Sequence, residues 1–240
     1  MSAQPERPAV LITGAAGTLG SALAFTFATA GWTVFAGVHQ TSLPVTSPGS
    51  IPIPLDVTST GDWTRAAELI SKRVPFLHAL IHNAGICEDS LLASTPVDAW
   101  DRTMAINLRA AAWGTRELLP LLRSRPGSHL VMVSSLASRA GGAGQSVYAA
   151  SKAALVGLAQ SLACELAPHG VRVNTVFPGV LPGPMTDALA PAARERWLEA
   201  NLLHTLNDPM EVARFIAFLV TTRNISGQVF HLDSRISPWT

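Results

Sequence analysis

The sequence predicts a single α/β domain in which helices cover both faces of a seven-stranded parallel sheet, a doubly wound arrangement. Short apolar runs, often β-branched, alternate along the 240 residues with longer segments of helical periodicity, as in consecutive βαβ units. A glycine-rich segment, residues 14–20, directly follows the first apolar run. Because 48% of the residues are hydrophobic and only 14% are charged, the chain can bury one large core.

The first part of the chain alternates strand and helix, with one exception. Strand 9–13 leads into helix 18–30, which ends at Gly31, a residue type that favours the left-handed C-terminal cap. Strand 33–38 follows. Strand 51–55 is expected at a sheet edge, because Pro52 and Pro54 cannot donate to a strand ladder. Residues 40–50 between them are rich in Pro, Gly, Ser and Thr, so a loop replaces the crossover helix and leaves one sheet face thinly covered.

The remaining segments continue the alternation to the C-terminus. A helix at 209–221 has Asp208 as its N-cap and a proline at its first position. No internal repeat or linker interrupts the pattern, so we expect an N-terminal arm, residues 1–8, and one domain, residues 9–240. The other expected elements are helix 63–72, strand 79–82, a long or bent helix 96–122, strand 130–134, helix 148–166, strand 172–177 and strand 228–232.

Composition excludes several classes of function. The net charge of +1, without long runs of either sign, argues against nucleic acid or an anionic membrane surface as a partner. Residues 1–8 lack the apolar region of a signal peptide, and the apolar runs are strand-sized or broken by Gly and Pro, so no membrane span is expected. Cys87 and Cys164 lie far apart and the histidines are scattered, so we expect no metal, two reduced thiols and a cytoplasmic location.

The glycine-rich segment predicts a Rossmann-type dinucleotide site. Gly14, Gly17 and Gly20 lie between a buried strand and a helix, where glycines permit a tight turn, close approach to a pyrophosphate and close helix–strand packing. Thr18 and Leu19 open the helix, whose N-terminus would hold the phosphates. The alternative is a tight turn with a purely structural role.

The choice between the two nicotinamide cofactors depends on residues near the end of the second strand. A carboxylate there would read the ribose 2′-hydroxyl, and a basic residue would accept a 2′-phosphate. No Asp, Glu, Lys or Arg occurs between Pro8 and Leu55, and only His39 lies near the required place. Without a repelling carboxylate NADP(H) is favoured over NAD(H), but without an arginine NAD(H) stays open.

Tyr148, the only tyrosine, is followed one helical turn later by Lys152. Residues four apart share a helix face, so phenol and ammonium lie together. A free phenol titrates near about 10, and a neighbouring cation would lower its pKa toward the neutral range, as a proton-transfer group requires. The alternative is a solvated pair on a helix surface.

Taken in order, these residues resemble the short-chain dehydrogenases/reductases. Over residues 9–232 the family pattern is matched by the glycine-rich turn, Asn83-Ala84-Gly85, Asn107, Ser135, Tyr148, Lys152 and Pro178-Gly179. The resemblance implies that Tyr148 is the general acid/base, that Lys152 lowers its pKa and holds the nicotinamide ribose, and that Ser135 orients the substrate carbonyl. Asn107 would anchor a water relay to the lysine. For the cofactor, the resemblance implies an adenine site at Asp56 and Val57, contacts at Asn83, Ala84 and Gly85, and a nicotinamide side at Pro178, Gly179 and Leu181.

Within that family, residues 82–92 and the spacing from Ser135 to Tyr148 are similar to the 3-oxoacyl-carrier-protein reductases. This similarity implies an NAD(P)H-dependent reductase whose substrate is a small carbonyl compound or an acyl thioester. The chain departs from that group at positions 87–88, where Cys87-Glu88 replaces a common Thr-Arg pair, and at Pro126 and His169, where basic residues are expected. Docking of an acidic carrier protein therefore stays open. Gly183 stands where a threonine usually contacts the carboxamide, with Thr186 nearby.

Two alternative functions stay open, and the sequence also predicts the substrate walls and the assembly state. The chain could be a catalytically retired cofactor-binding or sensor protein, or an epimerase or dehydratase, although its short C-terminal part leaves little room for a sugar-nucleotide domain. Segments 87–92, 138–146 and 182–206 are expected as loops that form the substrate walls. Residues 100–122 and 148–166 carry apolar side chains on more than one helix face, including Ala110–Trp113, Leu155, Leu158 and Leu162. We therefore expect a homotetramer built from dimers.

Overall fold

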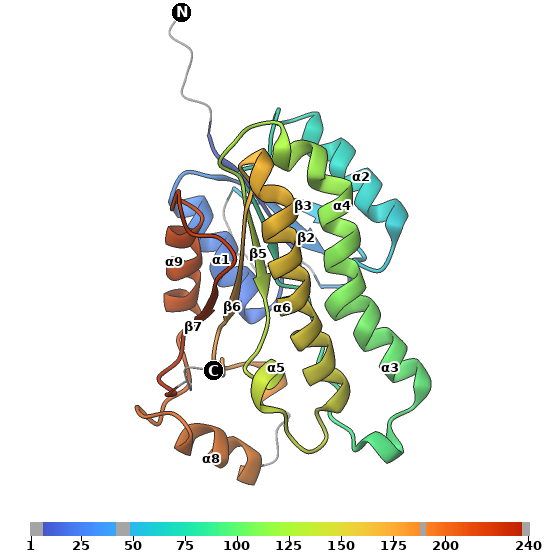
Figure 1. Cartoon of the computed structure of the whole chain (residues 1–240), viewed down its shortest axis with the longest axis vertical. Helices are drawn as coiled ribbons and strands as arrows, with labels where there is room; N and C mark the ends of the chain where they lie inside the picture. Colours follow the sequence, from blue (N-terminus) through green and yellow to red (C-terminus); the bar gives the residue numbers. More distant parts are fainter. Residues whose placement is uncertain (1–6, 42–48, 188–190, 237–240) are drawn as a thin grey trace, which may run out of the picture.

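The computed structural model describes residues 7–41, 49–187 and 191–236. Seven parallel strands form one sheet in the order β3-β2-β1-β4-β5-β6-β7 (Figure 1). The order reverses between β1 and β4, and ligands of doubly wound sheets bind beyond the carboxyl ends of the strands at this point. The predicted sheet, with its proline-bearing strand at one edge, is confirmed. The strands are β1 (Ala9–Ile12), β2 (Thr33–Val38), β3 (Ile51–Pro54), β4 (Ala79–His82), β5 (His129–Val133), β6 (Arg172–Phe177) and β7 (Val229–His231).

Helices cover both faces of the sheet. In Figure 1, α1 (Thr18–Thr29) and α9 (Pro209–Leu219) lie on one side, and α2 (Thr60–Ser71), α4 (Ala110–Arg123) and α6 (Ser146–Leu166) lie on the other. Each layer contributes to its own buried apolar cluster, because strand side chains alternate between the two faces. The strands run from the end of the molecule near the N-terminus toward the end where α5 (Ala137–Ala140) and α8 (Pro191–Glu199) lie.

The expected long helix 96–122 is interrupted rather than continuous. It consists of α3 (Val97–Met104), a π-helical turn at Ala105–Arg109 and α4. Asn107 lies inside the π turn and is 2% exposed. Such single wide turns inside α-helices are frequent at functional sites.

Several elements differ from the prediction. Helix α2 begins three residues earlier than expected, because the Ser59 side chain accepts a hydrogen bond from Asp62 N and caps the helix. The expected substrate loops contain α5, α7 (Pro184–Asp187), α8 and a 3₁₀ turn at Leu92–Ser94; a second 3₁₀ turn, Ala167–His169, follows α6. These helices are too short to show apolar periodicity. Residues 1–6 of the N-terminal arm, 42–48 of the expected loop 40–50, 188–190 and 237–240 lie outside the described residues.

One helical stretch has the length and hydropathy of a membrane span, although none was expected. By length and composition alone, the helical stretch Ser146–His169 could cross a bilayer, with a mean hydropathy of 1.2 in its best window. The single glycine and proline within it do not lower its hydropathy enough to exclude it. In the fold, this stretch packs on the sheet through Leu155, Ala159 and Ala163, as core helices do.

Candidate active site

The glycine turn after β1 forms a narrow backbone cradle at the start of α1. Gly14 has a φ of +63°, and a Cβ there would lie 2.9 Å from Ala84 Cα. A Cβ on Gly20 would lie 2.1 Å from the Gly14 carbonyl oxygen. Gly17 is the N-cap of α1, and Thr18 and Leu19 are its first residues. Leu19 points into the core, so only its backbone faces this turn. Side chains at Gly14 or Gly20 would collide with neighbouring backbone, so the turn needs glycine to pack this closely at the start of α1, as in a site for the pyrophosphate of a dinucleotide.

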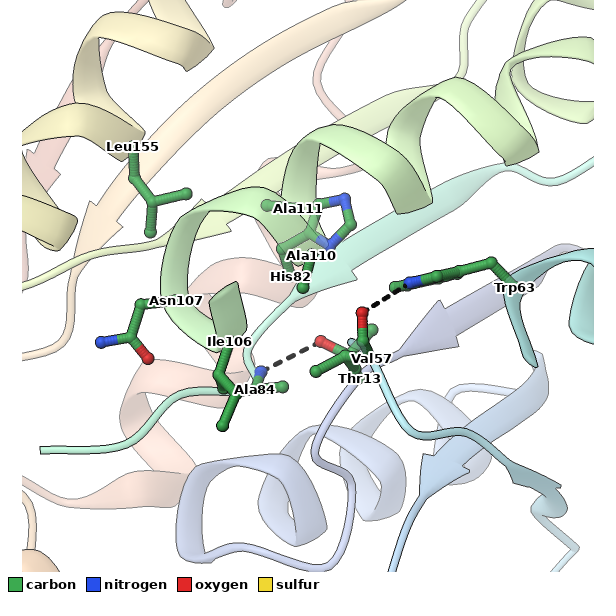
Figure 2. Close-up of a pocket in the computed structure, with 10 residues that line it drawn as sticks. All are labelled: Thr13, Val57, Trp63, His82, Ala84, Ile106, Asn107, Ala110, Ala111 and Leu155. Atoms are coloured by element: carbon green, nitrogen blue, oxygen red, sulfur yellow. Dashed lines mark hydrogen bonds between the residues drawn. The ribbon is translucent and has the colours of Figure 1, made fainter. Parts of the chain in front are cut away.

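Thr13 ties the turn after β1 to the turn after β4. Its hydroxyl accepts hydrogen bonds from Asn83 N and Ala84 N, both at 3.0 Å, and Figure 2 shows the second of these. Asn83 Nδ2 in turn donates to the carbonyl oxygens of Thr13 and Gly14. The two turns therefore act as one rigid edge beside the switch point. Thr13 was not predicted as a site residue; its signal in the sequence was a hydroxyl at the last position of an apolar strand.

A gap of about 10 Å³ lies behind this edge, between Thr13, Val57, His82 and Asn107 (Figure 2). It is far too small for a dinucleotide or substrate, so it is a packing gap that supports the site. His82 Nε2 lies 3.0 Å from Thr115 Oγ1, and burial lowers the pKa of His82 to about 3, which keeps the ring neutral.

The predicted adenine side lies at the ends of β2 and β3. His39 Nε2 lies 3.8 Å from Asp56 Oδ2, and the two side chains are 57% and 36% exposed. Asp56 Oδ1 accepts hydrogen bonds from the Thr58 amide and hydroxyl, while Trp63 Nε1 donates to the Val57 carbonyl. The structure thus brings His39, Asp56 and Val57 together and leaves His39 accessible.

The four predicted catalytic residues meet at the end of the sheet near β5 and the first turns of α6. Lys152 Nζ lies 5.8 Å from the centre of the Tyr148 ring and donates to Val133 O at 3.0 Å. Ser135, two residues beyond β5, is hydrogen-bonded with Tyr148. Asn107 Oδ1 accepts from Ile86 N, and its Nδ2 donates to Ile86 O and Ser151 Oγ.

Gly85 links this cluster to the turn after β4. A Cβ on Gly85 would lie 3.1 Å from Lys152 Nζ and 3.3 Å from Asn107 Oδ1. Lys152 and Asn107 are 4% and 2% exposed, so both polar groups lie in a largely dry environment. Ser151, which the sequence analysis did not single out, holds the Asn107 amide from α6.

Burial dominates the electrostatics of the pair. It raises the pKa of Tyr148 to about 12, with a further rise from Cys87 and an opposing effect of the Ser135 hydrogen bond. It lowers the pKa of Lys152 to about 8, against a smaller effect of Cys87. The expectation that Lys152 lowers the pKa of Tyr148 is therefore wrong for this arrangement: burial raises that pKa, and the ammonium faces the Val133 carbonyl.

The rim of the site carries acidic residues. The Cys87 thiol donates to Asp89, and burial together with Asp89 raises the pKa of this thiol. Gln145 Nε2 lies 3.3 Å from Asp89 Oδ2, so the segment after β4 contacts the segment before α6. Glu88 is exposed and pairs with Arg102.

The turn after β6 forms the predicted nicotinamide side. Gly179 has a φ of +75°, and a Cβ there would lie 2.8 Å from Asp233 Cβ. Pro178 O accepts a hydrogen bond from Asn207 Nδ2 at 2.8 Å. Thr186 Oγ1 donates to Leu181 O, which occupies the donor that a carboxamide contact would use.

Metal ligands do not cluster in the part of the chain that the structure describes. Residues 7–41, 49–187 and 191–236 contain no group of three or more His, Cys, Asp or Glu side chains that could hold an ion.

A doubly wound parallel sheet, a glycine cradle at its switch point and a Ser–Tyr–Lys cluster beside it define an NAD(P)-dependent oxidoreductase. The family model described as Enoyl-(Acyl carrier protein) reductase matches residues 14–234. The chain belongs to the short-chain dehydrogenase/reductase family.

Two similar proteins and one similar solved structure indicate which members of the family this chain resembles. A 3-oxoacyl-(acyl-carrier-protein) reductase from Thermotoga maritima is 34% identical, covering 95% of this chain and 97% of the relative. A cyclopentanol dehydrogenase from Comamonas sp. is 37% identical over 70% of this chain and 68% of that protein. The crystal structure of a dehydrogenase/reductase from Sinorhizobium meliloti 1021 superposes with a TM-score of 0.87 at 26% identity, covering 95% and 94% of the two chains.

Proposed function

We propose that this oxidoreductase is a ketoreductase of the 3-oxoacyl type, which reduces a ketone carbonyl to a secondary alcohol. The observation that carries the proposal is the buried cluster in which Ser135 is hydrogen-bonded with Tyr148 and Lys152 lies 5.8 Å from the phenol ring. The similarity to the Thermotoga maritima reductase over nearly the whole chain supports the substrate type.

In this proposal the nicotinamide cofactor supplies the hydride, and the protein supplies binding and the proton. The Ser135 hydroxyl and the Tyr148 phenol hold the carbonyl oxygen. The pKa of about 12 keeps Tyr148 protonated at neutral pH, so it can donate its proton to the oxygen as negative charge develops there. Lys152 in its charged form then stabilises the phenolate until a proton returns along the path anchored by Asn107.

Residues of three turns would hold the cofactor. Gly14, Gly17, Thr18 and Gly20 would bind the pyrophosphate, and Asp56 and Val57 would contact the adenine. Asn83 to Gly85 would lie along the dinucleotide, and Pro178, Gly179 and Leu181 would face the nicotinamide. The support is the close packing of these turns: at Gly14, Gly20 and Gly179 a methyl group would collide with neighbouring protein atoms, as expected of the glycine-dependent turns of dinucleotide sites.

A modest preference for NADPH over NADH belongs to the proposal. It rests on His39, which is accessible at the end of β2. The Asp56 carboxylate beside it, which accepts a hydrogen bond from Thr58, would repel a 2′-phosphate and so keeps the preference modest. Replacing His39 with Asp should penalise NADPH and leave NADH nearly unaffected. Steady-state kinetics with both cofactors measure this, and a wild-type enzyme that prefers NADH many-fold would contradict the proposal.

A second candidate substrate class is a neutral cyclic ketone or alcohol. The rim offers a carrier protein no free cation at positions 87–89, since Glu88 is paired with Arg102 and Asp89 is acidic, and a cyclopentanol dehydrogenase is among the similar proteins. Turnover of 3-oxoacyl thioesters, with and without a carrier protein, against cyclic and aromatic ketones separates the two classes. A retired sensor protein, the remaining alternative, would bind cofactor without turnover of any of them.

The proposal includes a cytoplasmic homotetramer. Both thiols, Cys87 and Cys164, are free, as in a reducing compartment. Trp100 and Trp113 remain 37% and 41% exposed along α3 and α4, a large apolar surface for a monomer to leave in water.

A further inference from the structure

The chain beyond β7 folds back as a short strap, defined here as Asp233, Ser234 and Arg235. Arg235 and Asp233 form an ion pair at 2.8 Å between side chains that are only 10% and 8% exposed. The Arg235 backbone amide also donates to Asp233 Oδ1 at 3.1 Å. The strap is therefore closed on itself by a nearly buried, charge-assisted contact.

Arg235 also reaches the helix that lies over the end of the sheet. Its guanidinium lies 4.8 Å from the centre of the Trp197 ring in α8, within the range of a cation–π interaction. Ser234 extends the connection to the residues after α8, because its hydroxyl accepts from Leu203 N and its carbonyl from Leu202 N. The strap thus holds both α8 and the segment that follows it.

The opposite side of the strap lies against the turn after β6. Asp233 packs so closely on Gly179 that a Cβ there would collide with it. Asn207 bridges the same region by donating to Pro178 O and Leu232 O. A hollow of about 230 Å³ opens between the strap, Asn207 and Val180. One short segment therefore connects α8 to the predicted nicotinamide side of the site.

We propose that Arg235 is a positioning residue, which holds α8 over the turn after β6 through Trp197 and so sets the shape of the substrate side of the cleft. The effect on substrate rests on the proposed function; the effect on α8 does not. Since Arg235 touches neither Tyr148 nor Ser135, its loss should alter binding more than the chemical step.

The test compares the wild type with four full-length variants by hydrogen exchange and by kinetics. Arg235→Ala removes the contact with Trp197, and Asp233→Asn combined with Arg235→Ala removes it without leaving an unpaired buried carboxylate. Arg125→Ala is the matched control, because Arg125 lies at the same 4.8 Å from the Phe76 ring but far from the strap. We expect both strap variants to raise the exchange rate of the α8 amides about tenfold, with the sheet unchanged.

With the best carbonyl substrate, the strap variants should raise KM about fivefold and change kcat less than about twofold. Arg235→Lys keeps the charge but not the planar stack on Trp197, so its KM should lie between that of the strap variants and that of the wild type. Unchanged α8 exchange in both strap variants would overturn the proposal, as would an equal increase throughout the sheet or in the Arg125→Ala control. If α8 loosens but the wild type reduces no carbonyl compound, the proposed function fails while the hold on α8 stands.

Discussion

At the scale of the residue, Lys152 must be both buried and positively charged, and burial opposes the charge. Its ammonium must stabilise a phenolate, yet burial lowers its pKa to about 8 and so disfavours the charged form. Because the pKa of Lys152 is 10.5 in the unfolded chain and about 8 in the folded protein, the unfolded chain binds this proton more tightly. The charged lysine therefore costs the fold stability at neutral pH, and the penalty disappears as the pH rises from about 8 to above 10.5.

Replacement of Lys152 by Met should remove the stability cost of the buried charge. We expect the variant to be more stable than the wild type at pH 7 by about 3 kcal/mol, since burial lowers the pKa of Lys152 from 10.5 to about 8. The gain should vanish near pH 11, and both turnover and cofactor affinity should fall. Urea unfolding at the two pH values measures the stability. A variant that is less stable at pH 7 would show that the buried ammonium is not a liability.

At the scale of the element, the turn that opens α1 depends on close packing of helix on strand. Gly20→Ala should abolish cofactor binding, because the added methyl group would lie 2.1 Å from Gly14 O and 2.8 Å from Ala15 Cα. Gly61→Ala in α2 is the control, since its Cβ would meet only Arg65 at 3.4 Å. Calorimetric titration with NADPH compares the two. Wild-type affinity in Gly20→Ala would contradict the role of this turn.

Elements with a strong local pattern could be predicted from the sequence. The glycine cradle and the Tyr148–Lys152 pair each lie within one turn of chain, so spacing alone revealed them. The contacts that organise the site join distant segments: Thr13 binds Asn83, Asp89 meets Gln145, and Arg235 stacks on Trp197. No local periodicity encodes such contacts. The prediction for the pKa of Tyr148 was wrong for the same reason, because burial is a property of the assembled fold.

At the scale of the whole molecule, two buried histidines make the fold sensitive to acid. Burial lowers the pKa of His82 and of His129 to about 3. As the pH falls below 6.5, the unfolded chain takes up two protons that the folded chain does not, so stability should fall by up to about 2.7 kcal/mol per pH unit. The loss should continue toward pH 3.

Urea unfolding between pH 6.5 and 5 measures this slope. Combined replacement of His82 and His129 by Asn should flatten it, whereas His169→Gln, at an exposed position, should leave it unchanged. A wild-type stability that does not vary over this range would mean that these histidines are protonated in the fold.

The predicted tetramer belongs to the same scale. Of the apolar residues on which the tetramer was predicted, Ala110, Ala111 and Leu155 are buried in the core and cannot face a partner. Trp113 is 41% exposed and should become buried on association. Light scattering at micromolar concentration should give about four times 25.3 kDa. A mass near 25.3 kDa would refute assembly, and Trp113→Glu should shift a genuine tetramer toward smaller species.

The proposed reduction depends most directly on Tyr148 as the proton donor. Transient kinetics of NADPH oxidation in the presence of a 3-oxoacyl thioester or ketone compare the wild type with Tyr148→Phe, which loses only the phenolic hydroxyl. We expect the rate of reduction to fall at least about a thousandfold while the dissociation constant of NADPH changes less than about threefold. A variant that keeps more than a few per cent of the wild-type rate would contradict the assignment of Tyr148 as the catalytic acid.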